Sequence, residues 1–362
     1  MGADAANLQP LRAIVSGLIP TRRVGRTSLS VSELGLGAAP LGNLYKAISD
    51  SDAAAIMHTV LEGGIRLVDT APYYGFGLSE RRVGDLTRMH RDVAISTKAG
   101  RLLIPAAATD KVSERYGFVS PMPFEPVFDY SRDGILRSFD ASLHRLGLTR
   151  VDILYVHDIG RETHGELDRH YRSQLVDEGG LEALAELRQS GSVSAIGLGV
   201  NEIEVCLELM QRSDFDVLLL AGRYTLLEQR ALDELLPRCL ETATSIVVGG
   251  PFNSGVLAAG SSGQGHYNYA AVPAEIRRRV QALEDICAAH GVPLAAAALQ
   301  FPLAHPAVAA VIPGFSNADE VRSGLDFYHF PIPAALWKDL RERELIDLRA
   351  PTSTASYESA AG

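Results

Sequence analysis

The amino-acid sequence predicts an α/β fold, a (β/α)8 TIM barrel preceded by a short N-terminal hairpin. Eight short apolar segments, each followed by a helical pattern, recur at regular spacing without a break in composition. Strands that are apolar throughout are typical of a buried parallel sheet, and eight such units close most simply into a barrel. The length of 362 residues and the hydrophobic content of 46% also suit one barrel.

The order of the elements follows from their patterns. Residues 21–32 alternate in polarity around Gly25 and predict the hairpin. The expected barrel strands are apolar runs at 34–41, 65–69, 93–98, 151–157, 195–199, 217–221, 245–248 and 308–312. The expected helices have apolar residues at helical spacing and lie at 50–62, 79–88, 131–146, 178–190, 201–212, 228–242, 274–290 and 294–301, with a last one starting at 318–323.

Length and charge indicate the organisation of the chain. One barrel domain is expected at 21–348, between a tail at 1–20 and a tail at 349–362. The formal charge of -10 and the pI near 5.5 argue against nucleic acid and anionic membranes as partners. No apolar run approaches the roughly 20 residues of a membrane helix, and the first residues lack a signal-peptide pattern. We therefore expect a cytoplasmic protein.

Three segments between the repeats carry no strand or helix pattern. Residues 99–129 predict a long functional loop that supplies substrate walls. Residues 160–177 predict a solvated surface loop, in which His164 and His170 are expected to face water rather than bind a metal. Residues 260–265 predict a flexible loop, a candidate to close over a cofactor.

The common sequence patterns of nucleotide-binding and metal-binding sites are missing from the sequence. The glycine pairs at 35–37, 75–77 and 197–199 lack the third glycine of G-x-G-x-x-G, which makes an open dinucleotide-binding sheet the weaker alternative. Cys206 and Cys239 fall within helical patterns, and with the distant Cys287 they form no metal spacing. We expect no metal site.

Four polar residues stand at or just after the ends of the second, third and fourth expected strands. Asp69 ends the second strand, Tyr74 follows five residues later, and Lys98 and His157 end the third and fourth. Taken singly, Asp69 could cap a turn and His157 could be a core histidine. A buried Lys98 ammonium needs a partner, however, and Asp69 on the adjacent strand can supply it. Because strand ends meet on one face of a barrel, the four are expected to form one site.

The spacing of these residues resembles the aldo-keto reductase family, over residues 22–348. The matching motifs, in the order of the family, are at 69–75, 79–80, 96–98, 142–147, 151–157 and 312–314. Shorter stretches at 39–43, 222–227 and 252–257 are similar to a branch with D-threo-aldose, L-fucose and L-galactose 1-dehydrogenases and pyridoxal 4-dehydrogenases. The resemblance implies hydride transfer between a nicotinamide and a carbonyl/alcohol pair.

The resemblance also implies a role for each of the four residues. Tyr74 is expected to be the general acid/base, with the Lys98 ammonium lowering its pKa from the usual value of about 10. Asp69 would hold Lys98 charged and in place, and His157 would hydrogen-bond the reacting oxygen. The family spacing selects Tyr74 rather than Tyr73, which is expected to line the pocket.

For the cofactor, the resemblance points to the loop after the seventh strand and the start of the last helix. Many members stack an aromatic ring on the nicotinamide where this chain has Gly249, and Phe252 or Tyr224 is the expected substitute. Asn201 is the expected contact of the carboxamide. The complete set of cofactor candidates is Asn201, Tyr224, Gly250, Pro251, Phe252, Asn253, Gly255, Gly314, Ser316, Asn317 and Glu320.

The sequence predicts NAD rather than NADP as the cofactor. Where NADP-preferring members place Lys and Arg, this chain has Gly314 and Glu320, with Asp319 beside them. Carboxylates repel a 2′-phosphate and can instead accept hydrogen bonds from a ribose hydroxyl. Arg322 is the residue that could overturn this prediction.

The expected substrate-binding residues are Tyr73, Arg101 and Phe124, and two reactions fit a site for a cyclic hemiacetal. One is NAD-dependent oxidation of C1 of an aldose of the L-fucose, L-galactose or D-arabinose type to a lactone. The other is oxidation of pyridoxal to 4-pyridoxolactone. A third interpretation is a redox-sensing binding subunit with little turnover. The direction of the reaction and the oligomeric state, a homo-oligomer included, stay open.

Overall fold

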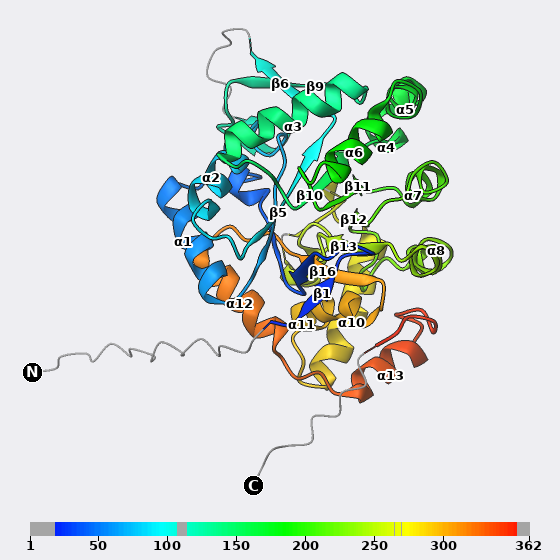
Figure 1. Ribbon diagram of the computed structural model, residues 1–362. Helices are drawn as coiled ribbons and strands as arrows, with labels where there is room; N and C mark the ends of the chain where they lie inside the picture. The colour runs from blue at the N-terminus through cyan, green and yellow to red at the C-terminus, as the bar shows by residue number, and fades with distance from the viewer. Residues whose placement is uncertain (1–18, 107–113, 264, 269, 353–362) are drawn as a thin grey trace, which may run out of the picture.

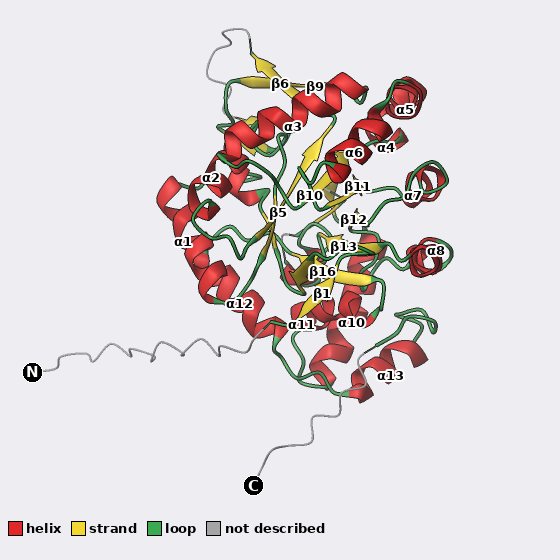
Figure 2. Ribbon diagram, in the orientation of Figure 1, coloured by secondary structure: helices red, strands yellow, loops and turns green. Residues whose placement is uncertain are grey.

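Eight parallel strands occupy the centre of the molecule, and helices surround them (Figures 1 and 2). The computed structural model describes residues 19–106, 114–263, 265–268 and 270–352. The central strands are β3 (Leu36–Gly37), β4 (Leu67–Asp69), β5 (Ala94–Ala99), β10 (Ile153–His157), β11 (Ala195–Val200), β12 (Val217–Ala221), β13 (Ser245–Gly249) and β16 (Val308–Ile312). The predicted fold class is confirmed.

The sheet closes nearly completely into a barrel. Its hydrogen-bonded order is β16-β13-β12-β11-β10-β5-β4-β3, all parallel. The two outer strands then meet through parallel bridges from Leu34 to Val311 and from Gly37 to Gly314. Closure removes the free edges that an open sheet would leave, and it brings the end of β16 beside the loops after β3 and β4.

The helices cover the outside of the barrel and lie close to the predicted ranges. They are α1 (Asp50–Glu62), α2 (Leu78–Thr87), α3 (Arg132–Leu146), α6 (Gly180–Gln189), α7 (Ile203–Leu209), α8 (Leu235–Thr242), α10 (Ala274–Ala289), α11 (Leu294–Gln300) and α12 (Ala318–Tyr328). Single 3-10 turns lie at η1 (Pro40–Gly42), η3 (Arg230–Leu232) and η4 (Phe301–Ala304). The sequence analysis did not predict α13 (Ala334–Glu342), whose Trp337 is buried.

Side chains of the strands alternate between the inside and the outside of the barrel. On β10, Tyr155 belongs to the inner hydrophobic cluster, whereas Val156 packs into the larger cluster between strands and helices. Successive residues of a strand point to opposite faces, so His157 continues the inner series. Lys98 on β5 is in step with Ala94 of the inner cluster for the same reason. The inner face therefore carries the polar residues at the strand ends.

The predicted N-terminal hairpin is present. It consists of β1 (Thr21–Arg23) paired antiparallel with β2 (Ser30–Ser32). Val24 and Val31 are buried in the inner cluster, and Gly25 lies against the Asp216 backbone just before β12. The hairpin thus covers the end of the barrel opposite to the carboxyl ends of the strands.

The prediction of a structureless loop at 99–129 is wrong. β6 (Arg101–Pro105) pairs antiparallel with β9 (Phe124–Phe128) in a ribbon beside α3 (Figure 1), and β7 (Glu114–Arg115) pairs with β8 (Phe118–Val119). The cause is long-range pairing, since each strand is too short to be recognised alone. Residues 107–113 of the predicted loop lie outside the described residues.

The prediction of a solvated loop at 160–177 is also wrong. This segment contains α4 (Arg161–His164), η2 (Gly165–Leu167) and α5 (Asp168–Asp177). His164 is buried rather than solvated, because its ring packs between those of Phe128 and Tyr171, with centres 4.5 Å and 4.3 Å away. His170 is exposed, as expected.

The segment after β13 has structure on both sides of the predicted loop at 260–265, whose described residues carry no helix or strand, as expected. It contains α9 (Val256–Ala259) and a hairpin of β14 (His266–Tyr267) and β15 (Ala270–Ala271), although residues 264 and 269 lie outside the described part. Residues 349–352, where we expected a tail to begin, contact the barrel. Arg349 pairs with Asp233 over 2.7 Å, and Arg341 donates to the Ala350 carbonyl.

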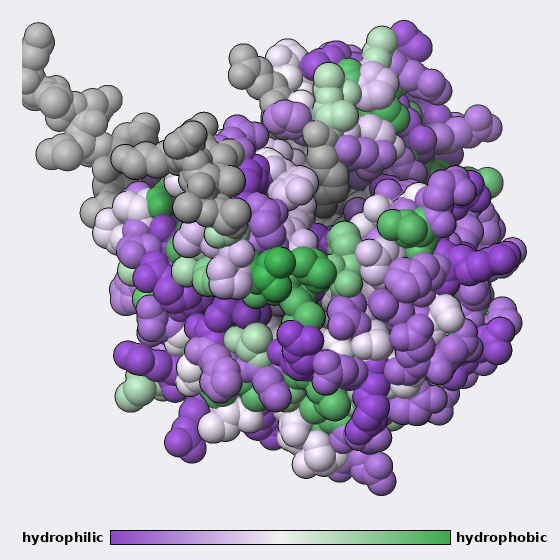
Figure 3. Space-filling view, turned by 90° about the horizontal axis from the view of Figure 1, so that it is seen from above, coloured by the Kyte–Doolittle hydropathy of each residue, from purple (hydrophilic) through white to green (hydrophobic). Residues whose placement is uncertain are grey.

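No single helix in the described residues is long and apolar enough to cross a membrane. One pair of consecutive segments is together long and apolar enough, namely Ala274–Ala289 with Leu294–Ala304. The two are bent by 101° relative to each other. The face of the molecule shown in Figure 3 is mostly hydrophilic, with smaller hydrophobic patches.

Candidate active site

A buried ion pair joins the ends of β4 and β5. The Lys98 ammonium donates to Asp69 Oδ2 over 2.6 Å and to the Thr70 carbonyl over 2.9 Å. The hydroxyl of Ser96, two residues before Lys98 on the same face, donates to Asp69 Oδ1 over 2.7 Å. Asp69 and Lys98 are 2% and 1% exposed, so each charge depends on the other for compensation. The structure brings these two predicted residues together.

The loop after β4 fixes Tyr74 beside this pair. The N–H of Ser79 at the start of α2 donates to the Tyr74 carbonyl over 3.1 Å. Gly75 has a φ of +64°, and a Cβ added there would lie only 2.4 Å from the Gly42 carbonyl oxygen. Any other residue would push the loop outward and displace Tyr74. With Gly75 in this position, the Tyr74 ring centre lies 4.8 Å from Lys98 Nζ.

His157 completes the group from the end of β10. Its ring centre lies 6.0 Å from that of Tyr74, with the two planes at 85°. Burial lowers the pKa of His157 well below its usual value, and the positive charges of Arg101 and Lys98 add to this, so the ring is neutral. Its Nδ1 is buried without a hydrogen-bond partner among the described residues, which leaves a polar atom for a ligand.

Burial works against the lowering of the Tyr74 pKa that we expected from Lys98. Burial raises the pKa of Tyr74 well above its usual value, and the carboxylates of Asp69 and Asp158 add to this rise. The Lys98 ammonium lies 4.8 Å from the Tyr74 ring centre and is paired with Asp69 over 2.6 Å. In this structure Tyr74 is therefore a protonated phenol, suited to donate a proton before it can accept one.

One cavity of about 600 Å³ opens next to Asp69 and Tyr74. Seven of its lining residues are glycines, which leave the backbone bare along the ends of β3, β12, β13 and β16. Most of the other lining side chains are apolar, and a smaller number are polar or charged. A cavity of this size and character is typical of a small-molecule or cofactor site.

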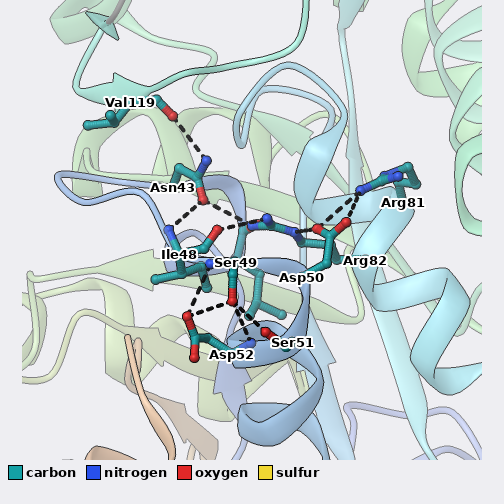
Figure 4. A network of polar contacts seen from close by, with 10 residues as sticks. Asn43, Ile48, Ser49, Asp50, Ser51, Asp52, Arg81, Arg82 and Val119 are labelled. Atoms are coloured by element: carbon teal, nitrogen blue, oxygen red, sulfur yellow. Dashed lines mark hydrogen bonds and ion pairs between the residues drawn. The ribbon is translucent and has the colours of Figure 1, made fainter.

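A polar network holds the loop at 43–48, part of which lines the cavity (Figure 4). Arg82 on α2 is buried, and its guanidinium donates to the carbonyls of Leu41 and Ile48 and to Asn43 Oδ1 over 2.8 to 3.0 Å. It also pairs with Asp50 over 2.8 Å at the start of α1. The network ties the loop to α1 and α2, so the cavity wall does not depend on loop backbone alone.

Comparison with known proteins identifies the family. The model of the Aldo/keto reductase family matches residues 33–344 of the chain. The chain belongs to this family. It is 43% identical to pyridoxal 4-dehydrogenase of Microbacterium luteolum, over 90% of this chain and 97% of that protein. It is 40% identical to D-threo-aldose 1-dehydrogenase of a Pseudomonas species, over 88% and 95%.

A solved structure extends the comparison to the fold. The holo form of an aldo-keto reductase from Bacillus halodurans superposes with a TM-score of 0.69 at 26% identity, covering 94% of this chain and 99% of that one. As an aldo-keto reductase with dehydrogenases among its relatives, the protein is an oxidoreductase acting on CH–OH groups. The family implies a nicotinamide cofactor and a small-molecule substrate.

The cavity of this aldo-keto reductase fits such a cofactor. Nine of the eleven predicted cofactor residues line it: Asn201, Gly250, Pro251, Phe252, Asn253, Gly255, Gly314, Ser316 and Glu320. A Cβ added at Gly255, where φ is +96°, would meet no atom within 4 Å, so the space in front of that glycine is free for a ligand. The bare backbone suits an extended dinucleotide, and of the four predicted catalytic residues Asp69 and Tyr74 line this cavity while Lys98 and His157 do not.

Three of the predicted cofactor residues have contacts of a different kind. Tyr224 does not line the cavity, because its ring packs in the core against Phe301 and His305. Asn253 lines it, but its side chain is used to accept from Thr225 and to donate to the Gly222 carbonyl. Asn317 caps α12 by accepting from the N–H of Glu320. Of the two predicted stacking rings, only Phe252 borders the cavity.

Glu320 is held at the start of α12 by its neighbours. Its carboxylate accepts from the Ser316 N–H over 2.7 Å, the Ser316 hydroxyl over 2.8 Å and the Asn317 amide over 2.7 Å. The carboxylate thus takes up the Ser316 N–H and two side-chain donors just before α12, where an anion could otherwise bind. Arg322 instead pairs with Asp319 over 2.7 Å.

The predicted substrate residues separate in space. Arg101 stacks on Tyr73, with its guanidinium carbon 4.0 Å from the ring centre, and Tyr73 contacts the ring of His157. Neither of the two lines the cavity directly. Phe124 pairs with Pro105 at the end of the ribbon away from Arg101 and does not line the cavity either.

The sequence analysis missed several polar residues at the cavity. Tyr45, Lys46, Glu162, Arg223 and Asn268 line it, and Arg223 contacts both Asn268 and Glu162. They come from three loops and from α4, so no local spacing could reveal them. Asp158 was missed although it follows His157 directly and strand ends were searched. Among the described residues, no group of three His, Cys, Asp or Glu side chains is arranged to hold a metal.

Proposed function

We propose that this aldo-keto reductase oxidises the hemiacetal carbon of a cyclic aldose to a lactone with NAD. The observation that carries the proposal is the convergence of Asp69, Tyr74, Lys98 and His157, with Asp69 and Tyr74 lining a glycine-rich cavity. The same set would serve the reverse reduction, so the geometry supports the chemistry rather than its direction.

The proton is managed by Tyr74 in this proposal. Bound NAD supplies the acceptor for the hydride that leaves the hemiacetal carbon. The hydroxyl proton of the substrate passes to the Tyr74 oxygen as the carbonyl forms, and His157 donates a hydrogen bond to the reacting oxygen. Lys98, fixed by Asp69, places a positive charge next to the Tyr74 ring and stabilises the phenolate that must exist first. Because the pKa of Tyr74 is raised, lactone formation should accelerate as the pH rises.

The contacts of Glu320 support NAD over NADP. A 2′-phosphate near α12 would have to displace the carboxylate from three hydrogen bonds and would be repelled by it and by Asp319. Arg322, the cation that could favour NADP, is already paired with Asp319. A ribose hydroxyl, in contrast, can donate to Glu320 without displacing it.

The polar lining supports an aldose as substrate. Lys46, Glu162, Asn201, Arg223 and Asn268 border the same cavity as Tyr74. A set that combines donors (Lys46, Arg223), an acceptor (Glu162) and two amides that do both suits a ring carrying several hydroxyl groups. One relative is named D-threo-aldose 1-dehydrogenase, which is a function of the same kind.

Pyridoxal is a second candidate on two observations. The relative named pyridoxal 4-dehydrogenase shares 43% identity with this chain, slightly more than the aldose enzyme. Aromatic rings also gather around Tyr74, with Tyr73, Phe118 and the exposed Tyr45 nearby, and could stack on a pyridine ring. We do not propose the redox-sensing subunit, since the relatives are enzymes and the four residues are intact.

The test is absorbance of the reduced nicotinamide with NAD or NADP and L-fucose, L-galactose, D-arabinose or pyridoxal. Turnover of an aldose with NAD is the expected result. Turnover of pyridoxal alone would replace the aldose with the second candidate and make the aromatic residues the specificity residues. No turnover of any of the four would overturn both, and cofactor binding retained in that case would return the redox-sensing interpretation.

A further inference from the structure

A second ion pair lies next to His157, with its arginine buried and its carboxylate partly exposed. Arg101, the first residue of β6, is 4% exposed, and its Nη2 donates to Asp158 Oδ2. Asp158 follows His157 at the end of β10, and Oδ2 of Asp158 lies 3.5 Å from His157 Nε2. Neither Arg101 nor Asp158 lines the cavity, so both would act through their neighbours rather than on a substrate.

The geometry of the pair is fixed on both sides. The Arg101 guanidinium carbon lies 4.0 Å from the Tyr73 ring centre and 4.9 Å from that of Phe128, so it is held between two rings. Asp158 has a φ of +48°, and its N–H donates to the Gly199 carbonyl over 2.9 Å. This backbone conformation turns its carboxylate back toward His157.

An ion pair whose arginine is buried and whose carboxylate is only partly exposed is poorly explained by stability alone. Desolvation of two charges usually cancels most of their attraction, and a hydrophobic pair of equal volume often serves a core as well. Arg101 Nε is also buried without a hydrogen-bond partner among the described residues. The desolvation of these groups costs free energy. Because the pair lies next to reacting groups, we infer that its charges act on the protonation of those groups.

We propose, resting on the function proposed above, that Arg101 and Asp158 are positioning residues with opposite electrostatic effects. Asp158 opposes loss of the Tyr74 proton, while Arg101 counters Asp158 and keeps His157 neutral. Because the two effects oppose each other, the intact pair holds the pH dependence of Tyr74 in place, and loss of either partner alone should shift it.

The charge effects agree in sign with this assignment. Asp158 raises the pKa of Tyr74 and Arg101 lowers it, after the larger effects of burial and Asp69. Arg101 also contributes to the lowered pKa of His157. The other titratable or charged groups that face this centre are Asp69, Lys98 and Tyr73, with Tyr130 on the His157 carbonyl and His164 behind Tyr130.

The experiment is a pH profile of kcat/KM for oxidation with Asp158→Asn, Arg101→Gln and the double variant. Asn tolerates the positive φ of Asp158, so Asp158→Asn should fold. The part of the profile in which kcat/KM rises as Tyr74 loses its proton is called the Tyr74 limb. We expect this limb to move to lower pH by about one unit in Asp158→Asn and to higher pH in Arg101→Gln. The double variant should return close to the unsubstituted enzyme, and Arg101→Lys should move the limb least because it keeps the charge.

A matched control is the ion pair of Arg188 and Asp216 at the other end of the barrel, with N and O 2.8 Å apart. Asp216→Asn should lower stability without moving the limb. The proposal is overturned if the Tyr74 limb stays in place in Asp158→Asn and Arg101→Gln, or moves in the same direction in both. Either result would show that the pair has a structural role alone.

Two further measurements separate this proposal from the proposed function. If no cyclic hemiacetal is oxidised, the same profiles are measured for reduction of a reactive aldehyde, and opposite limb shifts there would refute only the substrate. If nothing is turned over, the His157 ring is titrated by NMR. Arg101→Gln should then raise the pH at which the ring protonates, and no change would overturn the inference.

Discussion

Tyr74 shows how much of the proposed chemistry rests on one atom. The structure surrounds its ring with Asp69, Lys98 and His157, but only the phenolic oxygen can exchange the proton. We expect Tyr74→Phe to lower kcat/KM by about 10²–10⁴-fold, the usual contribution of general acid–base catalysis, while cofactor binding is unchanged. Reduced-nicotinamide absorbance measures the first and cofactor fluorescence the second.

Tyr73 is the matched control for this prediction. It is adjacent in sequence, carries the same phenol and contacts His157 from the other side. Tyr73→Phe should keep most of the activity. A more active Tyr74→Phe than Tyr73→Phe would reverse the assignment of the acid/base group.

Glu320 is the residue on which cofactor preference depends. Replacing its carboxylate by an ammonium removes the repulsion of a 2′-phosphate and adds an attraction. We expect Glu320→Lys to raise kcat/KM with NADP relative to NAD by about tenfold, a change of about 1.4 kcal/mol. Asp326→Lys, which adds the same charge on the exposed side of α12, should leave the ratio unaltered. An unchanged ratio in Glu320→Lys would place the 2′-position elsewhere.

At the scale of elements, the helices α4 and α5 depend on a neutral histidine. Burial lowers the pKa of His164 to about 4, and Tyr130 and His164 share a hydrogen bond of 3.0 Å. Its ring takes up a proton below about pH 6.5 when unfolded but only near pH 4 when folded. The free energy of unfolding therefore falls as the pH drops through this window, by of order 1–2 kcal/mol with allowance for solvent screening.

Denaturant unfolding between pH 7 and pH 4 measures this effect. His164→Phe should flatten the pH dependence, leaving the share of His157, whose pKa is also lowered. His170→Phe, an exposed neighbour on α5, is the control and should leave the slope as it is. An equal slope in His164→Phe would contradict the assignment.

The cavity loop at 43–48 depends on Arg82 more than on its own backbone. Arg82→Met would leave the carbonyls of Leu41 and Ile48 without this donor, while Asn43 Oδ1 would keep only the Ile48 N–H, at a cost of about 2–4 kcal/mol. Because the loop borders the cavity, we expect KM to rise more than kcat falls. Arg81→Met removes an exposed contact to the same Asp50, and it should be nearly neutral by both urea unfolding and kinetics. Equal effects of the two would refute the argument.

The elements also show what the sequence could and could not predict. The start of α1 was predictable because Ser49 and Asp52 form a local capping box, seen in Figure 4. The convergence of Asp69, Lys98 and His157 was predictable because barrel strand ends share one face. The β6–β9 ribbon and buried His164 were not, since they depend on pairing and packing between distant segments. The same holds for Arg223 and Glu162, which meet only in the folded barrel.

The net charge and the cavity are properties of the whole molecule rather than of single elements. Its formal charge of -10 and its largely hydrophilic face in Figure 3 agree with the expectation that it binds neither nucleic acid nor anionic membranes, which stays a prediction. Cytoplasmic location and a homo-oligomer likewise remain predictions. The cavity itself is a property of the whole barrel, because its walls come from loops after β3, β4, β11, β12, β13 and β16.

That dependence gives a prediction for thermal unfolding. The unfolded chain has no such cavity, so a cofactor binds the folded state alone and stabilises it by about 2.7 kcal/mol at one hundred times its Kd. We expect NAD to raise the Tm clearly and NADP to raise it less at equal concentration, because of Glu320. Tyr74→Phe should keep the NAD shift, since the phenolic oxygen exchanges a proton but does not build the cavity. A larger shift with NADP, or a shift lost in Tyr74→Phe, would show that the cofactor lies differently across the barrel.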